Sequence, residues 1–381
     1  MKSVSLGKLF GIKLELHWSF VLIALFVIGL FALSQPANLA PVSMTFFFLF
    51  FSVFLHELAH SVVSLQRGIK VKKIVLLPIG GVSLTDTLPE KPKDEFLIAI
   101  AGPAFNFAVA VSIIVLVLLL PVPFPRQLLA DFPALFYSTD TVLKPLLSMP
   151  LFTILWWNLL LGSFNLLLPA LPLDGGRVLR ALLSFQLGRV KATRIVTKAS
   201  SLIAIAMLFV GFAYANLLLM IIAFFVFFGS REEEKLVLMK ALLKDVKLSA
   251  YINKKPLLLN GSLSAEKAVE KMLKKKQRLA VVKLPGEKYA VISAEELPEL
   301  LEKKGLSLKE FLPETKPLPI NTSTGQAIEK TLIAGEHAIP VTKGKKLAGL
   351  IEAKDLEKAL LLTRAKNALE KKQHFKNTKS E

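Results

Sequence analysis

The chain has 381 residues, of which 53% are hydrophobic, and it carries a formal charge of +19. It contains no cysteine, which excludes a disulfide framework, a thiolate metal site and a cysteine nucleophile, so any metal must bind through His, Asp or Glu. The apolar residues are concentrated in residues 1–230, and the remainder is rich in lysine. This division predicts a membrane domain followed by a soluble part.

Long apolar segments recur through the first part of the chain. A hydrocarbon core of about 30 Å needs about 20 apolar residues per helix. The first candidate is too long for the apolar core of a signal peptide and lacks an A-x-A-like cleavage site, so we expect it to be retained. The last two are short, and they form either one long bent helix or, with better charge balance, a tight helical hairpin. The candidate spans are residues 16–34, 43–65, 96–120, 150–169, 198–213 and 215–229.

Basic residues are concentrated on one side of these segments. They occur in residues 2–13, 67–93 and 177–198, whereas the links at 35–42 and 121–148 contain few of them. Short loops rich in Lys and Arg stay on the cytoplasmic side of a membrane. The pattern therefore predicts a multi-pass protein of the cell membrane with both termini in the cytoplasm.

The sequence FLHELAH, from Phe54 to His60, places two imidazoles and a carboxylate inside the second apolar segment. In the pattern H-E-x-x-H on a helix, His56 and His60 lie on one face and can bind the same metal ion. Glu57 is displaced from His56 by about 100° around the helix axis. It is therefore better placed to act as a base on a metal-bound water than to bind the metal together with the two histidines. The pattern also arises by chance, but charged groups at mid-bilayer cost roughly 2.5 kcal/mol or more and usually mark a functional interior.

Residues 70–88 connect the second and third apolar segments and are interrupted by a proline and by Gly80 and Gly81. This stretch is too short to span a membrane as a helix, and it predicts a β-hairpin or re-entrant loop. Non-helical backbone at membrane depth must be buried in protein or line a wet cavity. A hairpin containing Gly80, Gly81 and Val82 offers a strand edge to an unwound substrate. The alternative is an ordinary interfacial loop.

Further polar residues lie in the apolar half. Asn106 belongs to AGPAFN, whose small residues permit close helix approach, and by itself it predicts an interhelical contact better than a catalyst. Asn158 and Asn165 lie in the fourth segment, and Asp174 follows two prolines that break the helix. Asp174 either caps the helix that begins at Gly175 or supplies the third protein ligand that catalytic zinc sites require.

Taken together, HELAH, GGVS, AGPAFN and FNLLLPALPLDGGR resemble motifs of the site-2 protease family of intramembrane zinc metalloproteases, in its branch with C-terminal cystathionine-β-synthase-type (CBS) domains. The resemblance spans essentially the whole chain. It implies that HELAH binds the metal, that GGVS forms the re-entrant hairpin and that Asp174 supplies the third ligand. Three leucines stand between Asn165 and Pro169 where two are commoner in the family, so Asp174 aligns more firmly than Asn165.

Two similar units follow a charged linker at 231–244. The first covers residues 245–307 and the second 308–365, and each is expected to contain strand, helix, strand, strand and helix at a period of about 60 residues. A charged tail, 366–381, ends the chain. The predicted fold is therefore an α-helical polytopic membrane domain of about six spans with a re-entrant β-hairpin, joined to a cytoplasmic α/β pair of CBS domains.

The resemblance to CBS pairs also implies an adenine-nucleotide site built from a hydroxyl residue and an aspartate before the last helix of a repeat. The first repeat has Ser293 but Glu296 in place of the aspartate, and the second has Asp355 but Glu352 in place of the hydroxyl residue. A carboxylate beside a phosphate is repulsive. Nucleotide binding and a purely structural role, such as homodimer formation, both stay open.

The function that the resemblance implies, and with which the residues agree, is hydrolysis of a peptide bond within or near a transmembrane segment of a membrane-bound substrate. One zinc ion is held by His56, His60 and Asp174, and Glu57 is the general base. Asn165, or else Asn158 or Asn106, hydrogen-bonds the oxyanion or the substrate backbone. The partners expected are a transmembrane protein and the lipid bilayer, and no nucleic acid. The alternatives are a metal transporter, which needs ligand pairs on several helices, and a catalytically silent binder, which has no need of a base.

Overall fold

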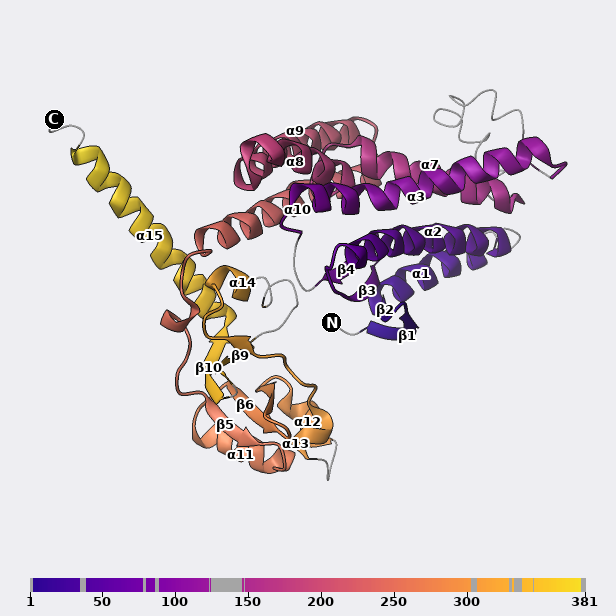
Figure 1. Cartoon of the computed structure of the whole chain (residues 1–381). Coiled ribbons are helices and arrows are strands. Elements are labelled where there is room, and N and C mark those ends of the chain that lie inside the picture. The colour runs from indigo at the N-terminus through magenta and orange to yellow at the C-terminus, as the bar shows by residue number, and fades with distance from the viewer. Residues whose placement is uncertain are drawn as a thin grey trace. The chain divides into compact units, whose positions relative to one another are not determined.

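The structure is a computed structural model that describes residues 3–34, 39–77, 80–85, 89–122, 124, 146, 148–302, 307–328, 331, 338–344 and 346–377. Most of the predicted link 121–148 and the turn at 78–79 lie outside the described residues. The chain forms two compact units, Met1–Lys235 and Leu236–Glu381, and each is described by itself (Figure 1).

A four-stranded sheet belongs to the first unit. Strands β1 (Ser3–Leu9) and β2 (Ile12–His17) form an antiparallel hairpin, β2 pairs in parallel with β3 (Val71–Leu77), and β3 pairs antiparallel with β4 (Gly80–Thr85). The predicted β-hairpin at 70–88 is thus present, and β4 is an edge strand. The strands β1 and β2 were not predicted, and they end immediately before the first apolar helix.

Helices occupy each of the six apolar segments of the first unit. Within the described residues, four of them, α2, α3, α7 and α9, are long and apolar enough to cross a membrane. Another helix, α8 (Asp174–Leu187), follows α7. The six are α1 (Trp18–Ser34), α2 (Leu39–Gln66), α3 (Pro92–Leu119), α7 (Pro150–Leu167), α9 (Arg189–Ala213) and α10 (Leu217–Leu242).

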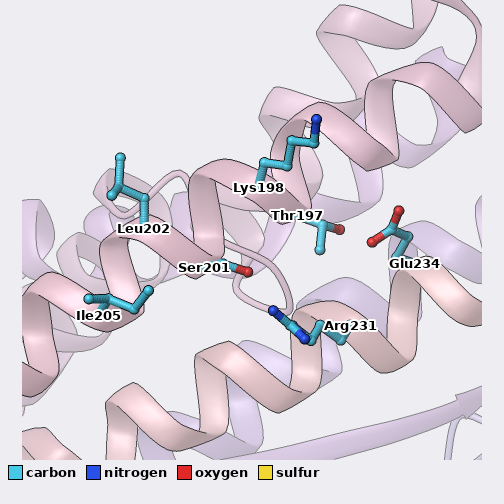
Figure 2. Close-up of a pocket in the computed structure, with 7 residues that line it drawn as sticks. All are labelled: Thr197, Lys198, Ser201, Leu202, Ile205, Arg231 and Glu234. Atoms are coloured by element: carbon cyan, nitrogen blue, oxygen red, sulfur yellow. The ribbon is translucent and has the colours of Figure 1, made fainter.

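The helices α9 and α10 form a hairpin, which was the favoured alternative for the last two apolar segments. The backbone N–H of Asn216 donates to the carbonyl of Gly211 over 2.7 Å in the turn between them. Farther from the turn, Thr197 Oγ1 of α9 lies 3.4 Å from the Ser230 carbonyl of α10. Figure 2 shows Thr197 and Ser201 of α9 on the side of the helix toward Arg231 of α10.

Helix α3 lies at the centre of the first unit, where it packs against α2, α7 and α8. One apolar cluster joins Ala110, Ile113 and Val117 of α3 to Phe152 and Leu155 of α7. Helix α8 contacts α3, α7 and α9, and its Arg180 lies against Glu95 near the start of α3. This arrangement brings Asp174, at the start of α8, beside His56 of α2.

The second unit contains the predicted repeat. In each copy, the first strand pairs in parallel with the second, and the second pairs antiparallel with the third. A short helix α13 (Leu308–Phe311) stands between the copies. The first copy contains β5 (Leu257–Asn260), α11 (Ala265–Lys274), β6 (Leu279–Leu284), β7 (Lys288–Ser293) and α12 (Leu297–Glu302), and the second contains β8 (Leu318–Pro319), α14 (Thr324–Ile328), β9 (Ala338–Lys343), β10 (Lys346–Glu352) and α15 (Ala353–Asn377).

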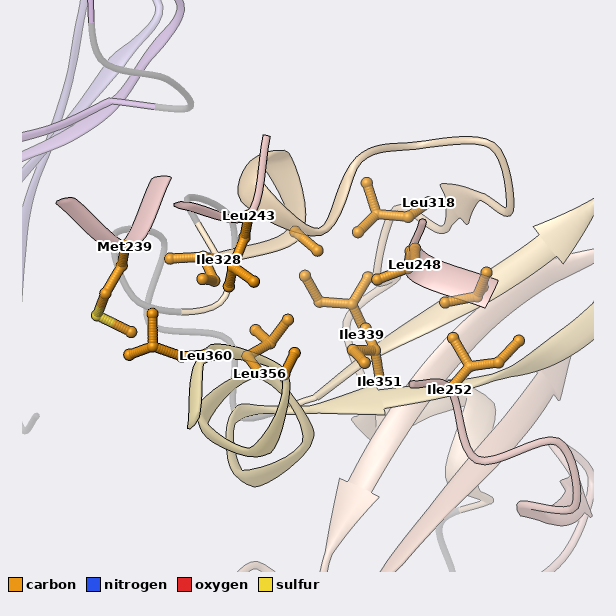
Figure 3. Packing of buried hydrophobic residues seen from close by; sticks show 13 residues of the cluster. Met239, Leu243, Leu248, Ile252, Leu318, Ile328, Ile339, Ile351, Leu356 and Leu360 are labelled. Atoms are coloured by element: carbon orange, nitrogen blue, oxygen red, sulfur yellow. The ribbon is translucent and has the colours of Figure 1, made fainter. Parts of the chain in front are cut away.

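The segment predicted as a linker, 231–244, is helical as far as Leu242, because its Arg, Glu, Lys and Leu residues are strong helix formers. Its end is also part of the second unit. Met239 and Leu243 are buried in one apolar cluster with Leu356 and Leu360 of α15 (Figure 3). Helix α15 in turn continues to Asn377, through most of the predicted tail.

We therefore predict that Leu243→Ala destabilises the second unit by about 2–5 kcal/mol, the cost of removing a fully buried leucine side chain. Leu243 is 0% exposed, whereas Leu361 of α15 is 65% exposed and provides the matched control Leu361→Ala. Hydrogen exchange of peptides from residues 248–365, measured in the full-length protein, reports the change. Equal hydrogen-exchange protection in the two variants would show that residues 236–244 connect the two units without stabilising the second one.

Candidate active site

Two histidines of α2 and the first residue of α8 form one buried polar cluster. His56 Nε2 lies 3.1 Å from Asp174 Oδ2, and His60 Nε2 lies 3.3 Å from the same oxygen. The two Nε2 atoms are 3.1 Å apart. Both His56 and Asp174 are buried. They lie side by side although 118 positions separate them in the sequence. The structure thus brings together the three residues that the sequence analysis predicts as metal ligands.

Helix α3 fixes the orientation of both rings through their Nδ1 atoms. His60 Nδ1 lies 2.6 Å from the Ile98 carbonyl, which can only accept a hydrogen bond, so Nδ1 donates and Nε2 is the ring nitrogen that a neutral His60 can offer to a metal ion. His56 Nδ1 lies 3.0 Å from Asn106 Oδ1, which can accept a hydrogen bond in the same way. Contacts of this kind commonly orient histidine ligands toward a metal ion.

Glycines permit the close approach of the helices around this cluster. A Cβ atom at Gly102 of α3 would lie 2.3 Å from His60 Nε2 and 2.6 Å from His56 Nε2. In α8, a Cβ atom at Gly175 would lie 2.3 Å from the Leu166 carbonyl oxygen, and the space at Gly176 is equally limited by the backbone. The motifs AGP and DGG are therefore sterically required for the three elements to meet.

Asp174 does not act as the helix cap that was its alternative role. The N-cap of α8 is Leu173, and Asp174 is the first residue of the helix, with its carboxylate directed at the two imidazoles. A negative charge at this position also interacts favourably with the positive end of the helix dipole.

Glu57 follows His56 on α2 and contacts the predicted hairpin. Ser83 of β4 donates a hydrogen bond to Glu57 Oε2 over 2.8 Å, and Ser61 Oγ lies 3.1 Å from Ser83 Oγ. A Cβ atom at Gly81 would lie 2.2 Å from Glu57 Cγ, so glycine is needed for β4 to pack on α2. Gly80 has a φ of +136°, and Val82 is 43% exposed.

The three asparagines differ in their surroundings. Asn106 contacts His56 through Oδ1, whereas its buried Nδ2 has no hydrogen-bond partner among the described residues. Asn158 donates through Nδ2 to Ser52 Oγ over 3.0 Å and to the Ile154 carbonyl over 2.8 Å. Asn165 is half-buried near the end of α7, and no hydrogen bond links it to the histidines within the described part of the chain.

The donor set fits a zinc ion. Two imidazole nitrogens and one carboxylate oxygen, from His56, His60 and Asp174, lie within 4.8 Å of one another. Three protein ligands of this type leave one position for water or substrate, which is the arrangement of catalytic zinc sites. Both Nε2 atoms are directed at the Asp174 carboxylate, so all three ligand atoms face one point, which agrees with that use.

A buried ion network, which the sequence analysis did not predict, holds α8 in place. Arg180 of α8 donates to Glu95 of α3, with Nε 2.8 Å from Oε1, and to Glu233 of α10, with Nη2 2.8 Å from Oε1. Arg180 is 2% exposed and Glu95 is 4% exposed. All three belong to the first unit, so the network fixes the helix that carries Asp174 between two neighbouring helices.

Comparisons with known proteins identify the family. The family model described as Peptidase family M50 matches residues 44–211, which include both histidines and Asp174. The zinc metalloprotease MJ0392 of Methanocaldococcus jannaschii is 31% identical over 367 residues, which cover 96% of this chain and 98% of the relative. The chain belongs to peptidase family M50, the site-2 protease family. It is an intramembrane zinc metalloprotease.

Two solved structures resemble parts of the protease. A site-2 protease from Methanocaldococcus jannaschii is 35% identical and has a TM-score of 0.45, over 61% of this chain and 95% of that chain. The CBS-pair protein CBSX2 of Arabidopsis thaliana is 17% identical and has a TM-score of 0.28, over 31% of this chain and 96% of that chain.

The packing of Gly102 leads to a direct prediction. In Gly102→Ala, the added methyl group displaces both imidazoles, so we expect zinc affinity to fall by about 10- to 100-fold, the usual effect of disturbing the groups that orient ligands. Competition with a chromophoric chelator measures the affinity in the purified protein. Ala104→Val is the control, because Ala104 is an exposed residue of the same helix. Wild-type affinity in Gly102→Ala would contradict the proposed contact between α3 and the ligands.

Proposed function

We propose that His56, His60 and Asp174 hold the catalytic zinc ion of this protease and that Glu57 is its general base. The observation that carries the proposal is the meeting of three ligand atoms within 4.8 Å, with Glu57 next to one ligand on the same helix. When bound, zinc supplies Lewis-acid chemistry that polarises a peptide carbonyl and acidifies water. The substrate is a transmembrane protein whose helix is locally unwound, because helical carbonyls are engaged in their own hydrogen bonds.

Glu57 performs the proton transfers in this mechanism. Its Oε2 accepts the hydrogen bond from Ser83, which holds the carboxylate in one orientation. The carboxylate takes a proton from the attacking water and delivers it to the leaving amine. The neighbouring His56 and Asp174 are buried, so the proton transfers take place beside groups that are largely shielded from bulk water.

Among the three asparagines, Asn106 is the best candidate to bind the oxyanion or the substrate backbone. Its Oδ1 is engaged with His56, and its Nδ2 is a buried donor without a partner among the described residues, beside the ligand cluster. The amide nitrogen of Asn158 already has two acceptors, so that side chain offers only an oxygen, which cannot stabilise negative charge. This reverses the order of preference from the sequence, which favoured Asn165.

We further propose that the edge strand β4 binds the unwound substrate by adding it to the sheet. The residues Gly80, Gly81 and Val82 lie in this strand, which has a neighbour on one side only within the described sheet. Strand addition at a free edge satisfies the backbone of an extended peptide. It also places the peptide beside Glu57, because β4 packs against α2.

The topology we propose places both termini and the active-site end of α2 on the cytoplasmic side. The bias of Lys and Arg toward residues 2–13, 67–93 and 177–198 supports it. In this arrangement the protease crosses the membrane several times, and its repeats lie in the cytoplasm.

Nucleotide binding and dimerisation by the repeats stay predictions. Asp355 Oδ2 accepts a hydrogen bond from the backbone N–H of Glu352 over 3.0 Å, and Glu296 makes the same contact with Ser293 in the first repeat, over 2.8 Å. Burial, with the nearby Glu352 charge adding to it, raises the pKa of Asp355. Both acids therefore have a local structural role at the start of a helix, which competes with a role in binding phosphate.

The base assignment is tested by Glu57→Gln. Amide and carboxylate have nearly the same shape, so zinc content should stay at the wild-type level while turnover falls by at least about 100-fold through loss of the base. Metal analysis and cleavage of a single-span substrate in the same preparation measure both. Glu232→Gln, at an exposed position of α10, is the control and should cleave normally. Cleavage by Glu57→Gln at the wild-type rate would overturn the assignment.

The asparagine assignment has a separate test in Asn106→Asp. The new carboxylate keeps an acceptor for His56 Nδ1 but replaces the Nδ2 donor with a negative oxygen. Zinc should therefore remain, while turnover falls by about 100- to 1000-fold, as when an oxyanion donor is removed. Asn158→Asp, which loses donors only to Ser52 and Ile154, should affect stability more than turnover. Unchanged turnover in Asn106→Asp would restrict this residue to orienting His56.

A further inference from the structure

An open recess of about 550 Å³ lies between α9 and α10, near the end of the hairpin that is opposite its turn. None of its lining residues belongs to the group of proposed zinc ligands, His56, His60 and Asp174. Figure 2 shows the lining side chains, which come from both helices of the hairpin. They are Thr197, Lys198, Ser201, Leu202 and Ile205 of α9 and Arg231 and Glu234 of α10.

The recess has a net positive lining. Lys198 and Arg231 are exposed, and within the described ranges no carboxylate forms an ion pair with either of them. Glu234 contributes one negative charge, which leaves an excess of one positive charge. The Arg231 guanidinium lies 4.2 Å from the centroid of the Phe227 ring, a contact with its face that leaves the N–H donors at its edge available.

The same face of α9 becomes apolar toward the turn. Leu202 is 70% exposed and Ile205 is 44% exposed, and both line the recess. Phe209 and Phe212 continue this face at helical spacing and are 71% and 77% exposed. Because α9 is long and apolar enough to cross a membrane, such side chains are suited to contact acyl chains rather than water.

We infer that this recess binds an anionic glycerophospholipid. Lys198 and Arg231 bind the phosphate of the headgroup, the lysine as a point charge and the arginine through paired N–H donors. Ser201 supplies a hydroxyl donor, and one acyl chain lies along Leu202, Ile205 and Phe209. Basic recesses between transmembrane helices on the cytoplasmic side are suited to acidic headgroups. The inference rests on the proposed topology for the side of the membrane, but not on the assignment of the catalytic residues.

A soluble anion is a poorer occupant on the same observations. Inorganic phosphate would interact with the two cations and with Ser201, but it would leave Leu202 and Ile205 uncovered. A zwitterionic lipid would cover the apolar residues, but its own ammonium group would compete with Lys198 for the phosphate. An acidic headgroup attached to acyl chains both pairs with Lys198 and Arg231 and covers Leu202 and Ile205.

The test uses the full-length protein in detergent, titrated with phosphatidylglycerol, with phosphatidylcholine of the same acyl chains or with inorganic phosphate. Native mass spectrometry counts the bound lipid, and the melting temperature reports folding. We expect one tightly held phosphatidylglycerol per chain. In Lys198→Gln/Arg231→Gln its affinity should fall by about 30-fold, the effect of two basic residues at an anionic surface, with no change of melting temperature in phosphatidylcholine.

The matched control is Lys70→Gln/Lys93→Gln, which removes the same charge from exposed positions of the same unit outside the recess. It should retain wild-type affinity. If the Lys198/Arg231 variant is unstable, Ser201→Phe fills the recess while both cations remain, and it should also weaken phosphatidylglycerol binding. Equal affinity in the recess variants and the control, or an equal rise of melting temperature with inorganic phosphate alone, would overturn the inference.

Discussion

The meeting of two imidazoles and one carboxylate at a single, largely buried point is the constraint on which the rest of the membrane unit depends. His56 is 5% exposed and Asp174 is 8% exposed, and polar groups removed from water are costly unless they have partners. Helix α3 satisfies the outer ring nitrogens through Asn106 and the Ile98 carbonyl, and Gly102 lets it approach. Helix α8 must then be held close, which the buried Arg180 network achieves. A bound zinc ion adds its own binding free energy to this packing.

Part of this site follows from local sequence patterns. The spacing of His56 and His60 is read directly from the helical period, and the prolines before Asp174 indicate that the chain turns there. The two repeats are recognisable because strand and helix signals recur at a regular period. The hairpin at Gly80 and Gly81 is predicted because it is too short and too interrupted for a helix. In each case the information lies within a few consecutive residues, so one sequence is sufficient.

Other features depend on contacts between distant residues. The strand β2 alternates apolar and polar residues from Ile12 to His17, yet its partner is β3, and Leu14 pairs with Ile74. Arg180 and Glu95 are 85 positions apart, and in the sequence Arg180 resembles the other basic residues that determine topology. In the sequence, nothing favours Asn106 over Asn158 and Asn165 as a candidate oxyanion donor. Only burial and hydrogen bonding in the structure do so. Such distinctions require three-dimensional packing, which local propensity does not contain.

The central claim is that this protein's zinc ion is bound by two histidines of α2 and one carboxylate of α8. X-ray absorption spectroscopy at the zinc edge of the purified full-length protein tests it most directly. The account predicts the multiple-scattering signature of two imidazoles, with nitrogen at about 2.0–2.1 Å and the remaining ligands oxygen at about 2.0–2.2 Å. A first shell composed of oxygen alone, or one with a single imidazole, would contradict it.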